Sequence, residues 1–328
     1  MMSSCDLHAH VAEHQKNICQ IVALKDGKTR INDCWNGFAP ADALHVMSAT
    51  KSVVSLLVGI ALDQGLIESV QQRVLDFFPD YAVKRGERTI QSVTIEHLLT
   101  MTAPYKYRSE PWTKICTSEN WTNATLDILG GKAGLTGEFR YSTLGIHILT
   151  GILAKASGLT TVDFANKYLF EPIGVAPHRN FEALTAEEHR AFILDKRPKE
   201  NIWFADPQGV GAAGYGLCLS ALDMARIGQL CLNHGACGGR QVVSAGWIAE
   251  STRPRRQCDE TFARMGYGYL WWTPDMNKPA YAALGNSGNV IYVNPARNTV
   301  VAVSSTFKPN VLDRVQFIER QIEPLLDA

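Results

Sequence analysis

The chain has 328 residues, which is enough for one large domain or two ordinary domains with a sizeable core. Hydrophobic residues make up 46% and charged residues 20%, a globular composition that excludes a disordered or collagen-like chain. Lysine plus arginine and aspartate plus glutamate both number 32, so the formal net charge is zero. The sequence shows no basic stripe, and we therefore expect no nucleic-acid partner.

The apolar stretches are short. The longest, residues 53–62, covers about half of the roughly 20 residues that a membrane span needs. The first ten residues do not contain a basic stretch followed by an apolar one, the pattern of a secretory signal. We therefore expect a cytoplasmic protein without a membrane partner. Its eight cysteines have no C-x-x-C spacing, and in that compartment we expect reduced thiols.

Strand patterns stand at both ends of the chain and helical patterns between them. Two runs, residues 18–24 and 29–35, flank Asp26-Gly27, a dipeptide typical of a hairpin turn. Helical patterns follow at residues 49–66, 94–101, 143–156, 162–170 and 221–233. Strand patterns return at 267–273, 281–284, 290–293 and 299–304, and an amphipathic stretch at 311–326 closes the chain as a helix.

This order of elements predicts an α+β fold. One antiparallel sheet, built from both chain ends and flanked by the first and last helices, is the simplest way to bury both sets of strands. The middle of the chain then forms an all-helical region. We place a sheet domain at residues 1–68 together with 240–328, and a mostly helical domain at 69–239. A cleft between two such regions is a common place for an active site.

Residues 47–62 contain a Ser-x-x-Lys string, Ser48 to Lys51, and are apolar nearly all round after the lysine. This pattern is typical of a buried helix, with both side chains on one face at its N-terminal end. The helix N-terminus favours an anion near the serine oxygen, and burial lowers the pKa of the lysine, so that it can accept the serine proton. A serine N-cap followed by a solvated lysine is the alternative. A second such string, Ser305 to Lys308, follows a strand pattern and is cut off by a proline, so we assign it no function.

Two further segments carry groups suited to the same reaction. Tyr141 precedes the predicted helix at 143–156, where a nearby lysine ammonium would lower the pKa of the phenol and make it a general base. An ordinary packed tyrosine is the alternative. Residues 284–290, Leu-Gly-Asn-Ser-Gly-Asn-Val, fall at a turn or strand edge, where backbone N–H groups could bind an oxyanion. A plain hairpin turn is the alternative there.

Taken in order, the three segments resemble the serine β-lactamase-related family of penicillin-binding folds. This family includes class C β-lactamases, D-alanyl-D-alanine carboxypeptidases, and esterases and amidases. Softer matches at residues 94–102, 213–217 and 266–272 extend the resemblance over most of the chain. The resemblance implies a β-lactamase-like fold, with Ser48 as the nucleophile that forms an acyl-enzyme and Lys51 as its proton acceptor.

The same resemblance implies roles for the other two segments. Tyr141 stands at the tyrosine of the family's Tyr-x-Asn motif and would handle protons to the serine and the leaving group. Asn286, Ser287 and Gly288 stand at its Lys-Thr-Gly motif. The backbone N–H groups of Ser48 and Asn289 would then form the oxyanion hole.

Two positions depart from the family's pattern. Thr143 takes the place of the motif's asparagine, and a short hydroxyl replaces a two-ended amide. Asn286 takes the place of the lysine and removes the positive charge that would recognise a substrate carboxylate. We therefore expect a hydrolase acting on a small ester or amide without a recognised carboxylate. A β-lactamase or D-alanyl-D-alanine carboxypeptidase, with a nearby donor such as an arginine in place of the lysine, is one alternative, and a catalytically silent binding protein of the same fold is another.

Two other motifs receive no weight. Asp6, His8, His10 and His14 resemble the start of a metal-dependent hydrolase, but no strand pattern precedes them, and a frayed terminus or short helix is expected. Residues 209–214 match G-x-G-x-x-G, but neither a strand before them nor an acidic residue after them completes a dinucleotide site. We therefore expect neither a metal nor an organic cofactor.

Overall fold

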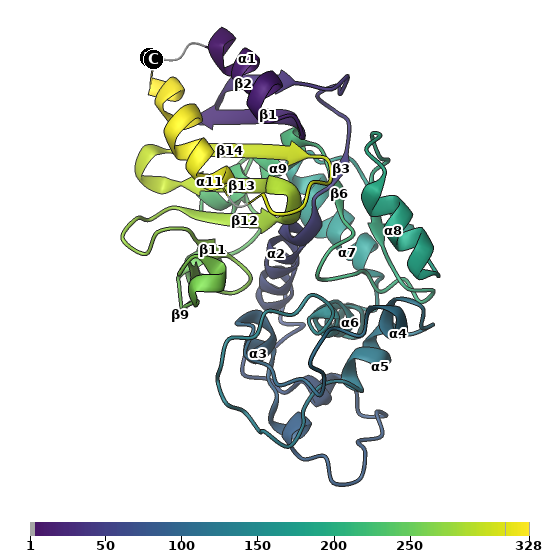
Figure 1. The fold of residues 1–328 in the computed structure, drawn as a ribbon. Coiled ribbons are helices and arrows are strands. Elements are labelled where there is room, and N and C mark those ends of the chain that lie inside the picture. The colour runs from purple at the N-terminus through teal and green to yellow at the C-terminus, as the bar shows by residue number, and fades with distance from the viewer. Residues whose placement is uncertain (1–3, 312, 328) are drawn as a thin grey trace.

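An antiparallel sheet built from both ends of the chain dominates the structure, a computed structural model that describes residues 4–311 and 313–327. Its eight strands follow the order β2-β1-β14-β13-β12-β11-β10-β9 (Figure 1). They are β1 (Ile18–Lys25), β2 (Lys28–Cys34), β9 (Arg256–Gln257), β10 (Gly266–Tyr267), β11 (Trp272–Thr273), β12 (Tyr281–Gly285), β13 (Asn289–Asn294) and β14 (Thr299–Ser305). The predicted α+β class and the predicted origin of the sheet are confirmed.

The first hairpin follows from its turn residues. Asp26 and Gly27 take φ angles of 52° and 71°, the left-handed region that a tight hairpin turn requires. The strands on either side pair from Gln20 with Cys34 to Lys25 with Lys28. The Asp-Gly signal in the sequence therefore predicts this turn correctly.

Side chains alternate along each strand, so successive residues of a strand point to opposite faces of the sheet. A separate hydrophobic core lies on each face. On β14, Val300 and Ala302 join the larger core, whereas Val301 and Val303 join the smaller one. The smaller core is covered by α1 (Ser4–His14) and by the C-terminal turns α11 (Arg314–Phe317), η9 (Ile318–Ile322) and η10 (Glu323–Asp327). Figure 1 shows α11 in front of the sheet and α9 (Ala221–Leu232) behind it.

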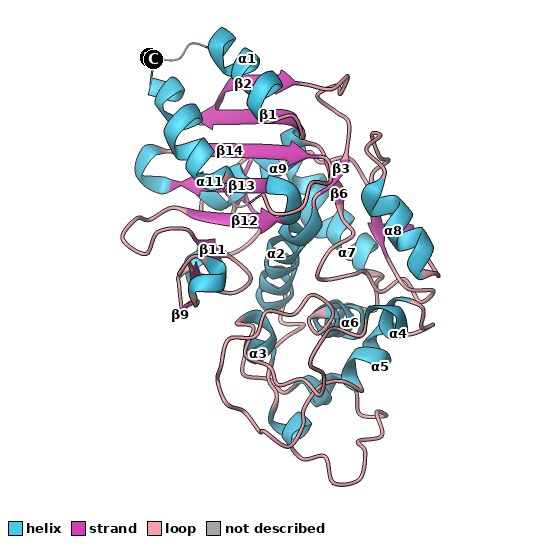
Figure 2. Cartoon of the chain, in the orientation of Figure 1, coloured by secondary structure: helices cyan, strands magenta, loops and turns pink. Residues whose placement is uncertain are grey.

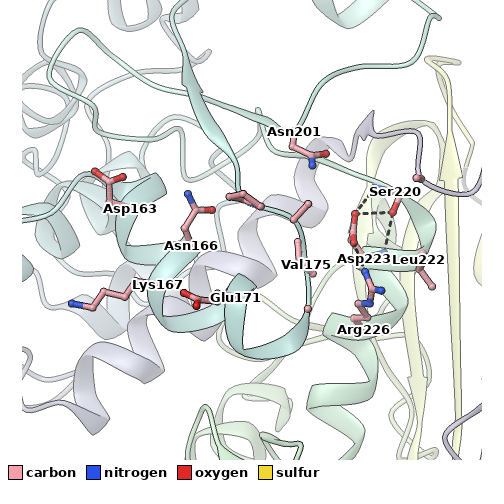
Figure 3. A pocket seen from close by; sticks show the side chains of 14 residues that line it. Asp163, Asn166, Lys167, Glu171, Val175, Asn201, Ser220, Leu222, Asp223 and Arg226 are labelled. Carbon is pink, nitrogen blue, oxygen red and sulfur yellow. Dashed lines mark hydrogen bonds and ion pairs between the residues drawn. The ribbon is translucent and has the colours of Figure 1, made fainter.

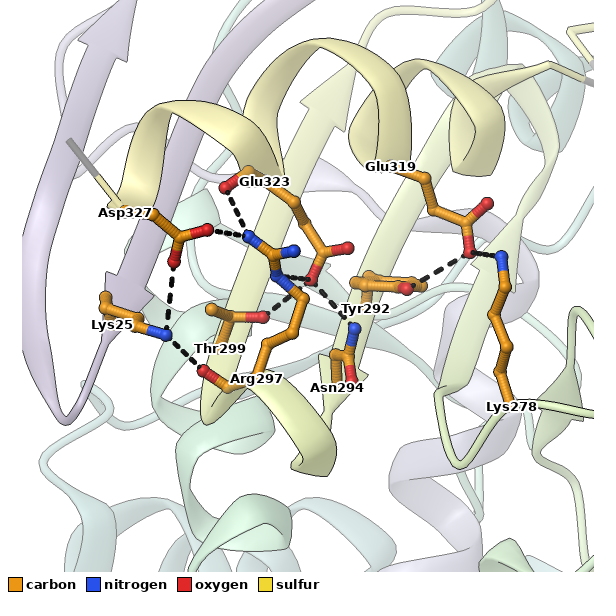
Figure 4. A network of polar contacts seen from close by, with 9 residues as sticks. All are labelled: Lys25, Lys278, Tyr292, Asn294, Arg297, Thr299, Glu319, Glu323 and Asp327. Atoms are coloured by element: carbon orange, nitrogen blue, oxygen red, sulfur yellow. Dashed lines mark hydrogen bonds and ion pairs between the residues drawn. The ribbon is translucent and has the colours of Figure 1, made fainter.

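A polar network fixes the C-terminal turns to the sheet (Figure 4). The buried Glu323 carboxylate accepts hydrogen bonds from Asn294 Nδ2 at 3.0 Å and from Thr299 Oγ1 at 2.8 Å. At the chain end, Lys25 of β1 lies 3.4 Å from Asp327. Strands from both chain ends and the last helical turns therefore form one connected unit.

Helix α9 lies closer to the sheet than its place in the predicted helical domain implies. It packs against β14, β13 and β1, and a Cβ at Gly228 would lie only 2.5 Å from Val300 Cγ1. This helix therefore covers the sheet, although the predicted boundary put residues 221–232 in the helical domain. The division of the chain into two domains stays a prediction.

Helices, loops and short strand pairs make up the rest of the molecule, so the middle of the chain is mostly but not wholly helical, and the predicted all-helical region is wrong in this respect (Figure 2). The helices are α2 (Thr50–Asp63), α3 (Ile95–Leu99), α4 (Trp112–Cys116), α5 (Trp121–Leu126), α6 (His147–Ser157), α7 (Thr161–Ala165), α8 (Ala186–Leu194) and α10 (Ala245–Thr252). Shorter turns are η1 (Met47–Ala49), η2 (Val74–Phe77), η3 (Thr89–Ser92), η4 (Asn166–Phe170), η5 (Glu171–Ile173), η6 (Glu260–Phe262), η7 (Asn286–Gly288) and η8 (Pro295–Arg297). Short strands pair as β3 (Leu44–His45) with β6 (Cys218–Leu219), β4 (Arg179–Phe181) with β5 (Ile202–Phe204), and β7 (Ala236–Cys237) with β8 (Arg240–Gln241).

Several predicted elements differ from the observed ones. The stretch 267–273 is not one strand, because Leu270 takes a φ of 63° and turns the chain between β10 and β11. The helix predicted at 143–156 begins only at His147, because the preceding residues form an irregular turn. The helix predicted at 94–101 ends at Leu99, and Met101 takes a φ of 56°. Helices α4, α5, α8 and α10 lie outside the predicted helical stretches.

The membrane prediction can be compared with the helices. Within residues 4–311 and 313–327, no single helix has the length and apolar character to cross a membrane. One pair, His147–Ser157 with Thr161–Ile173, reaches that length and character only together, and it is bent by 76°. The cytoplasmic location stays a prediction.

Candidate active site

Ser48 lies where η1 runs into α2. Met47 before it takes a φ of 53°, a region that residues other than glycine rarely adopt. The Thr50 hydroxyl closes this turn with a hydrogen bond to the Met47 carbonyl at 2.7 Å. The helix that follows is buried from Thr50 to Ala61, as its apolar pattern predicts, whereas Ser48 itself is partly exposed. The fold therefore presents a hydroxyl at the start of a buried helix.

Lys51 lies directly behind this hydroxyl. Its Nζ is 2.9 Å from Ser48 Oγ and 2.7 Å from the Gly214 carbonyl oxygen, and the side chain is only 2% exposed. In the part of the chain that the structure describes, no carboxylate lies within ion-pair distance of it. Burial lowers the pKa of Lys51 to about 7, while the charge of Glu110 opposes this shift. The direction agrees with the predicted depression of the lysine pKa, and burial favours the neutral amine.

Tyr141 completes a cluster of three groups. Its ring centroid lies 4.7 Å from Lys51 Nζ. Burial raises the pKa of the phenol, with a smaller rise from the charge of Glu110, and a hydrogen bond with Ser48 lowers it only in part. The pKa of the phenol is therefore raised, opposite to the lowering that we expected from the lysine charge. Burial is the largest influence and favours the protonated phenol, while the role of Tyr141 as a general base stays a prediction.

An unpredicted carboxylate holds the turn that follows Tyr141. Glu110 Oε1 accepts hydrogen bonds from the backbone N–H groups of Thr143 at 2.5 Å and Leu144 at 3.0 Å, and from Ser142 Oγ at 2.8 Å. Thr143, which takes the place of the family's asparagine, is partly exposed. A contact of Thr143 with substrate stays a prediction. Its backbone N–H helps to hold the turn through the hydrogen bond to Glu110.

The loop 209–214 supplies the other partner of Lys51. It is neither strand nor helix, and its last residue, Gly214, accepts the hydrogen bond from the lysine through its carbonyl. A Cβ at Gly214 would lie 2.1 Å from the Thr143 carbonyl oxygen. Only glycine therefore allows this loop to pack against the turn after Tyr141. This close approach accounts for the last glycine of the G-x-G-x-x-G string.

The predicted residues at the sheet edge form η7, the turn between β12 and β13. Asn286 is exposed, and its Oδ1 accepts a hydrogen bond from Ser287 N at 2.9 Å. Ser287 and Asn289 are buried, and Asn289 Oδ1 accepts from the Ser305 backbone N–H at 2.9 Å. These bonds fix the turn to the end of β14. The binding and oxyanion roles of four residues stay predictions: Asn286, Ser287, Gly288 and Asn289.

The residue that touches the serine turn is Gly285, one position before η7. A Cβ there would lie 2.2 Å from the Val46 carbonyl oxygen and 3.2 Å from Ala49 N. The end of β12 therefore packs directly against the backbone on both sides of Ser48. The sequence correctly predicted that residues 284–290 lie at a turn or strand edge. It did not predict the contact of Gly285 with the serine turn.

The two discounted motifs and the described cysteines fit structural roles. Asp6, His8, His10 and His14 lie in helix α1, as expected for a short helix, and not at the end of a strand. In the described ranges, no group of three His, Cys, Asp or Glu side chains is arranged to hold a metal ion. The seven described cysteines are free of disulfides, namely Cys19, Cys34, Cys116, Cys218, Cys231, Cys237 and Cys258.

A separate pocket of about 770 Å³ opens between η4, η5 and the start of α9 (Figure 3). None of Ser48, Lys51 and Tyr141 lines it. On its wall Asp223 accepts a hydrogen bond from Ser220 Oγ at 2.7 Å and pairs with Arg226 at 3.0 Å. Because these polar groups already satisfy one another, they do not mark a second site.

Known proteins resemble this chain in sequence and in fold. A model of the Beta-lactamase family matches residues 9–321. A 6-aminohexanoate-dimer hydrolase from Paenarthrobacter ureafaciens is 26% identical over 294 residues, which cover 83% of this chain and 68% of that protein. Two solved structures share the fold. One, a putative 6-aminohexanoate-dimer hydrolase from Bacillus anthracis, has a TM-score of 0.73 at 16% identity and covers 97% of this chain and 81% of its own. The other, a family VIII carboxylesterase, has a TM-score of 0.67 at 18% identity and covers 94% of this chain and 92% of its own.

Proposed function

Because this chain belongs to the Beta-lactamase family, we propose that it is a serine hydrolase that cleaves small ester or amide substrates through an acyl-enzyme at Ser48. The observation that carries the proposal is the buried Lys51 amine, 2.9 Å from Ser48 Oγ, with its pKa lowered to about 7. A lysine in this state accepts the serine proton at the moment the oxygen attacks. The hydrolytic relatives, one named for an amide substrate and one for esters, support the same reaction.

The geometry supports the following sequence of steps. Ser48 Oγ attacks the substrate carbonyl carbon, and its proton passes to the neutral amine of Lys51. The C–O or C–N bond of the substrate breaks, and the leaving group takes up a proton from Lys51 or through the Tyr141 hydroxyl. Water then attacks the acyl ester and gives a proton to the neutral Lys51, the bond between Ser48 Oγ and the acyl carbon breaks, and Lys51 returns the proton to Ser48 as the carboxylic acid leaves. Tyr141 acts in this scheme as a protonated donor, because burial raises the pKa of its phenol.

The charges around the site favour substrates without a recognised carboxylate. Asn286 puts an uncharged, exposed side chain where the family's motif has lysine. An arginine does lie against this turn, since a Cβ at Gly288 would lie 2.6 Å from Arg314 Nε. Arg314 is only 2% exposed, however, and it donates to Gln15 at 3.0 Å and to Asn17 at 3.2 Å. It is therefore not open to a substrate carboxylate, which argues against a β-lactamase or carboxypeptidase that relies on this arginine.

Labelling with a fluorophosphonate probe, read by intact mass, tests the nucleophile. The wild-type protein should gain one adduct and hydrolyse p-nitrophenyl acyl esters, and Ser48→Ala should do neither while keeping its thermal midpoint. Ser305→Ala is a matched control, because Ser305 also begins a Ser-x-x-Lys string, yet its hydroxyl is buried and without a hydrogen-bond partner. It should retain both activities.

Three results would contradict the proposal or redirect it. Hydrolysis that survives in Ser48→Ala would remove this serine as nucleophile. Ester binding without any adduct in the wild type would favour a silent binding protein of this fold. Rapid turnover of a chromogenic cephalosporin without any ester hydrolysis would favour a β-lactamase.

A further inference from the structure

Glu110 is a polar residue next to the Ser48–Lys51–Tyr141 cluster that has no role in the proposed reaction steps. It lies in the irregular segment before α4, and one of its oxygens receives the hydrogen bonds that hold the turn 142–144. Ser142 reinforces the same turn, because its Oγ also accepts from the Gly145 N–H at 2.8 Å. The turn begins directly after Tyr141. Glu110 therefore fixes the backbone that aims the phenol at Ser48 and Lys51.

The charge of Glu110 is not neutralised nearby. Within residues 4–311 and 313–327, no lysine, arginine or histidine lies within ion-pair distance of its carboxylate, whose partners are N–H groups and hydroxyls. A negative charge without a paired cation acts on its surroundings through a partly buried, low-dielectric region, where its effect is weakly screened. It favours the protonated form of Lys51 and opposes ionisation of Tyr141.

Other charged groups around α2 do not compete with this effect. His147 of α6 faces Lys51, but burial lowers its pKa to about 3, with a further lowering by Lys51, so the imidazole is neutral. Lys167 of η4 is exposed and lies over the Tyr168 ring. Glu250 of α10 is exposed and pairs with two arginines. Glu110 is thus the charge that biases the Ser48–Lys51–Tyr141 cluster.

We propose that Glu110 is a positioning residue of this site, which holds the Tyr141 turn through its hydrogen bonds and, through its charge, sets the pH above which Lys51 can take the serine proton. The inference rests on the proposed function, because it concerns the same acylation step. The two parts of the role are separable. Glu110→Gln keeps an oxygen acceptor for the turn and removes the charge, whereas Glu110→Ala removes both.

The rate at which the fluorophosphonate labels Ser48, measured from pH 5.5 to 9, tests this role. In the wild type the rate should rise with pH as Lys51 loses its proton. Removing the negative charge lowers the pKa of the lysine further, so the rise in Glu110→Gln should move to lower pH. The ratio of the variant's rate to the wild-type rate should then be about threefold higher at pH 6 than at pH 8.5, equivalent to a shift of about half a pH unit. Glu110→Ala should show the same shift and, in addition, about a tenfold slower rate at every pH, because the turn loses its acceptor.

Glu138→Gln is the matched control. Glu138 is exposed and stands three positions before Tyr141. The variant loses the same charge as Glu110→Gln, but its labelling rate should rise at the same pH as that of the wild type. A Glu110→Gln profile that coincides with the wild type would overturn the inference and leave the serine mechanism standing. A wild type that gains no adduct at Ser48 at any pH would overturn the proposed function, and this inference with it.

Discussion

The two walls of the site differ in how they are built. The helical wall keeps the reactive groups of the family's pattern, with Ser48, Lys51 and Tyr141 in one cluster. The sheet wall has an uncharged residue, Asn286, where the resemblance puts the family's lysine, and it meets the serine turn with bare backbone at Gly285. In the proposed reaction, the helical wall would carry the proton transfers and the sheet wall would supply shape.

This difference separates chemistry from substrate choice. Proton transfer from the serine needs a small number of groups at fixed short distances, so the helical wall tolerates little change. Asn286, the proposed recognition residue of the other wall, is exposed, so we expect its replacement to change affinity without touching the reacting atoms. A chain of this fold can thus keep the hydrolytic step and change the compounds it accepts.

The largest loss of activity is expected from a substitution in the helical wall. Lys51→Ala should lower kcat/KM for ester hydrolysis by about 10³-fold, because loss of a positioned base removes a factor of this order. Lys167→Ala is the control, since Lys167 is an exposed cation of η4 without a contact to Ser48. The measurement is steady-state kinetics together with a thermal midpoint for each variant. A Lys51→Ala enzyme that keeps most of its activity would show that the amine is only structural.

A smaller effect is expected at the backbone contact of the sheet wall. Gly285→Ala puts a Cβ 2.2 Å from the Val46 carbonyl oxygen, so β12 and the serine turn must move apart. Overpacking of this kind costs about 1–3 kcal/mol of unfolding free energy. We expect kcat/KM to fall by about 10-fold or more, because a displacement of the reacting groups by a fraction of an ångström is enough for that loss.

Gly246→Ala is the control that separates the steric clash at Gly285 from a general effect of replacing glycine by alanine. A Cβ at Gly246, in α10, would meet nothing within 4 Å, so this variant should keep its activity and its stability. If Gly285→Ala behaved like Gly246→Ala, the tight fit between β12 and the serine turn would have no part in catalysis.

The parts of the site that could be predicted from sequence are the local ones. Ser48 and Lys51 are one helical turn apart, so their spacing and the apolar residues after them were enough to predict their contact. Glu110 was missed because its partners, residues 142–144, are distant in sequence and only the fold brings them together. The predicted pKa direction of Tyr141 was wrong because burial, the largest influence on this phenol, is not visible in a sequence.

The exact position of the turn at the sheet edge could not be predicted from the sequence. The string Gly-Asn-Ser-Gly offers two glycines, and only the pairing of Gly285 with Asn289 shows that the three residues between them form the turn. The structure has a short helical turn at these positions, with Ser287 at a φ of 70°, and whether the turn also binds an oxyanion stays a prediction. The fold class was easier to predict, because strands at both chain ends leave few ways to bury them.

The smallest effect is expected from restoring the missing charge on the sheet wall. Asn286 is exposed, so Asn286→Lys adds a cation at the family's lysine position at the cost of one hydrogen bond to Ser287 N. Exposed charges contribute about 0.2–1 kcal/mol, which corresponds to a KM about 1.4- to fivefold lower for an acyl substrate that carries a carboxylate. An uncharged ester of the same size should keep its KM. Asn286→Gln controls for the lost hydrogen bond, and about 0.5 M salt should abolish the gain if it is electrostatic. Equal KM values for both substrates in Asn286→Lys would show that carboxylate recognition depends on more than this one position, and that the sheet wall has changed in shape as well as in charge.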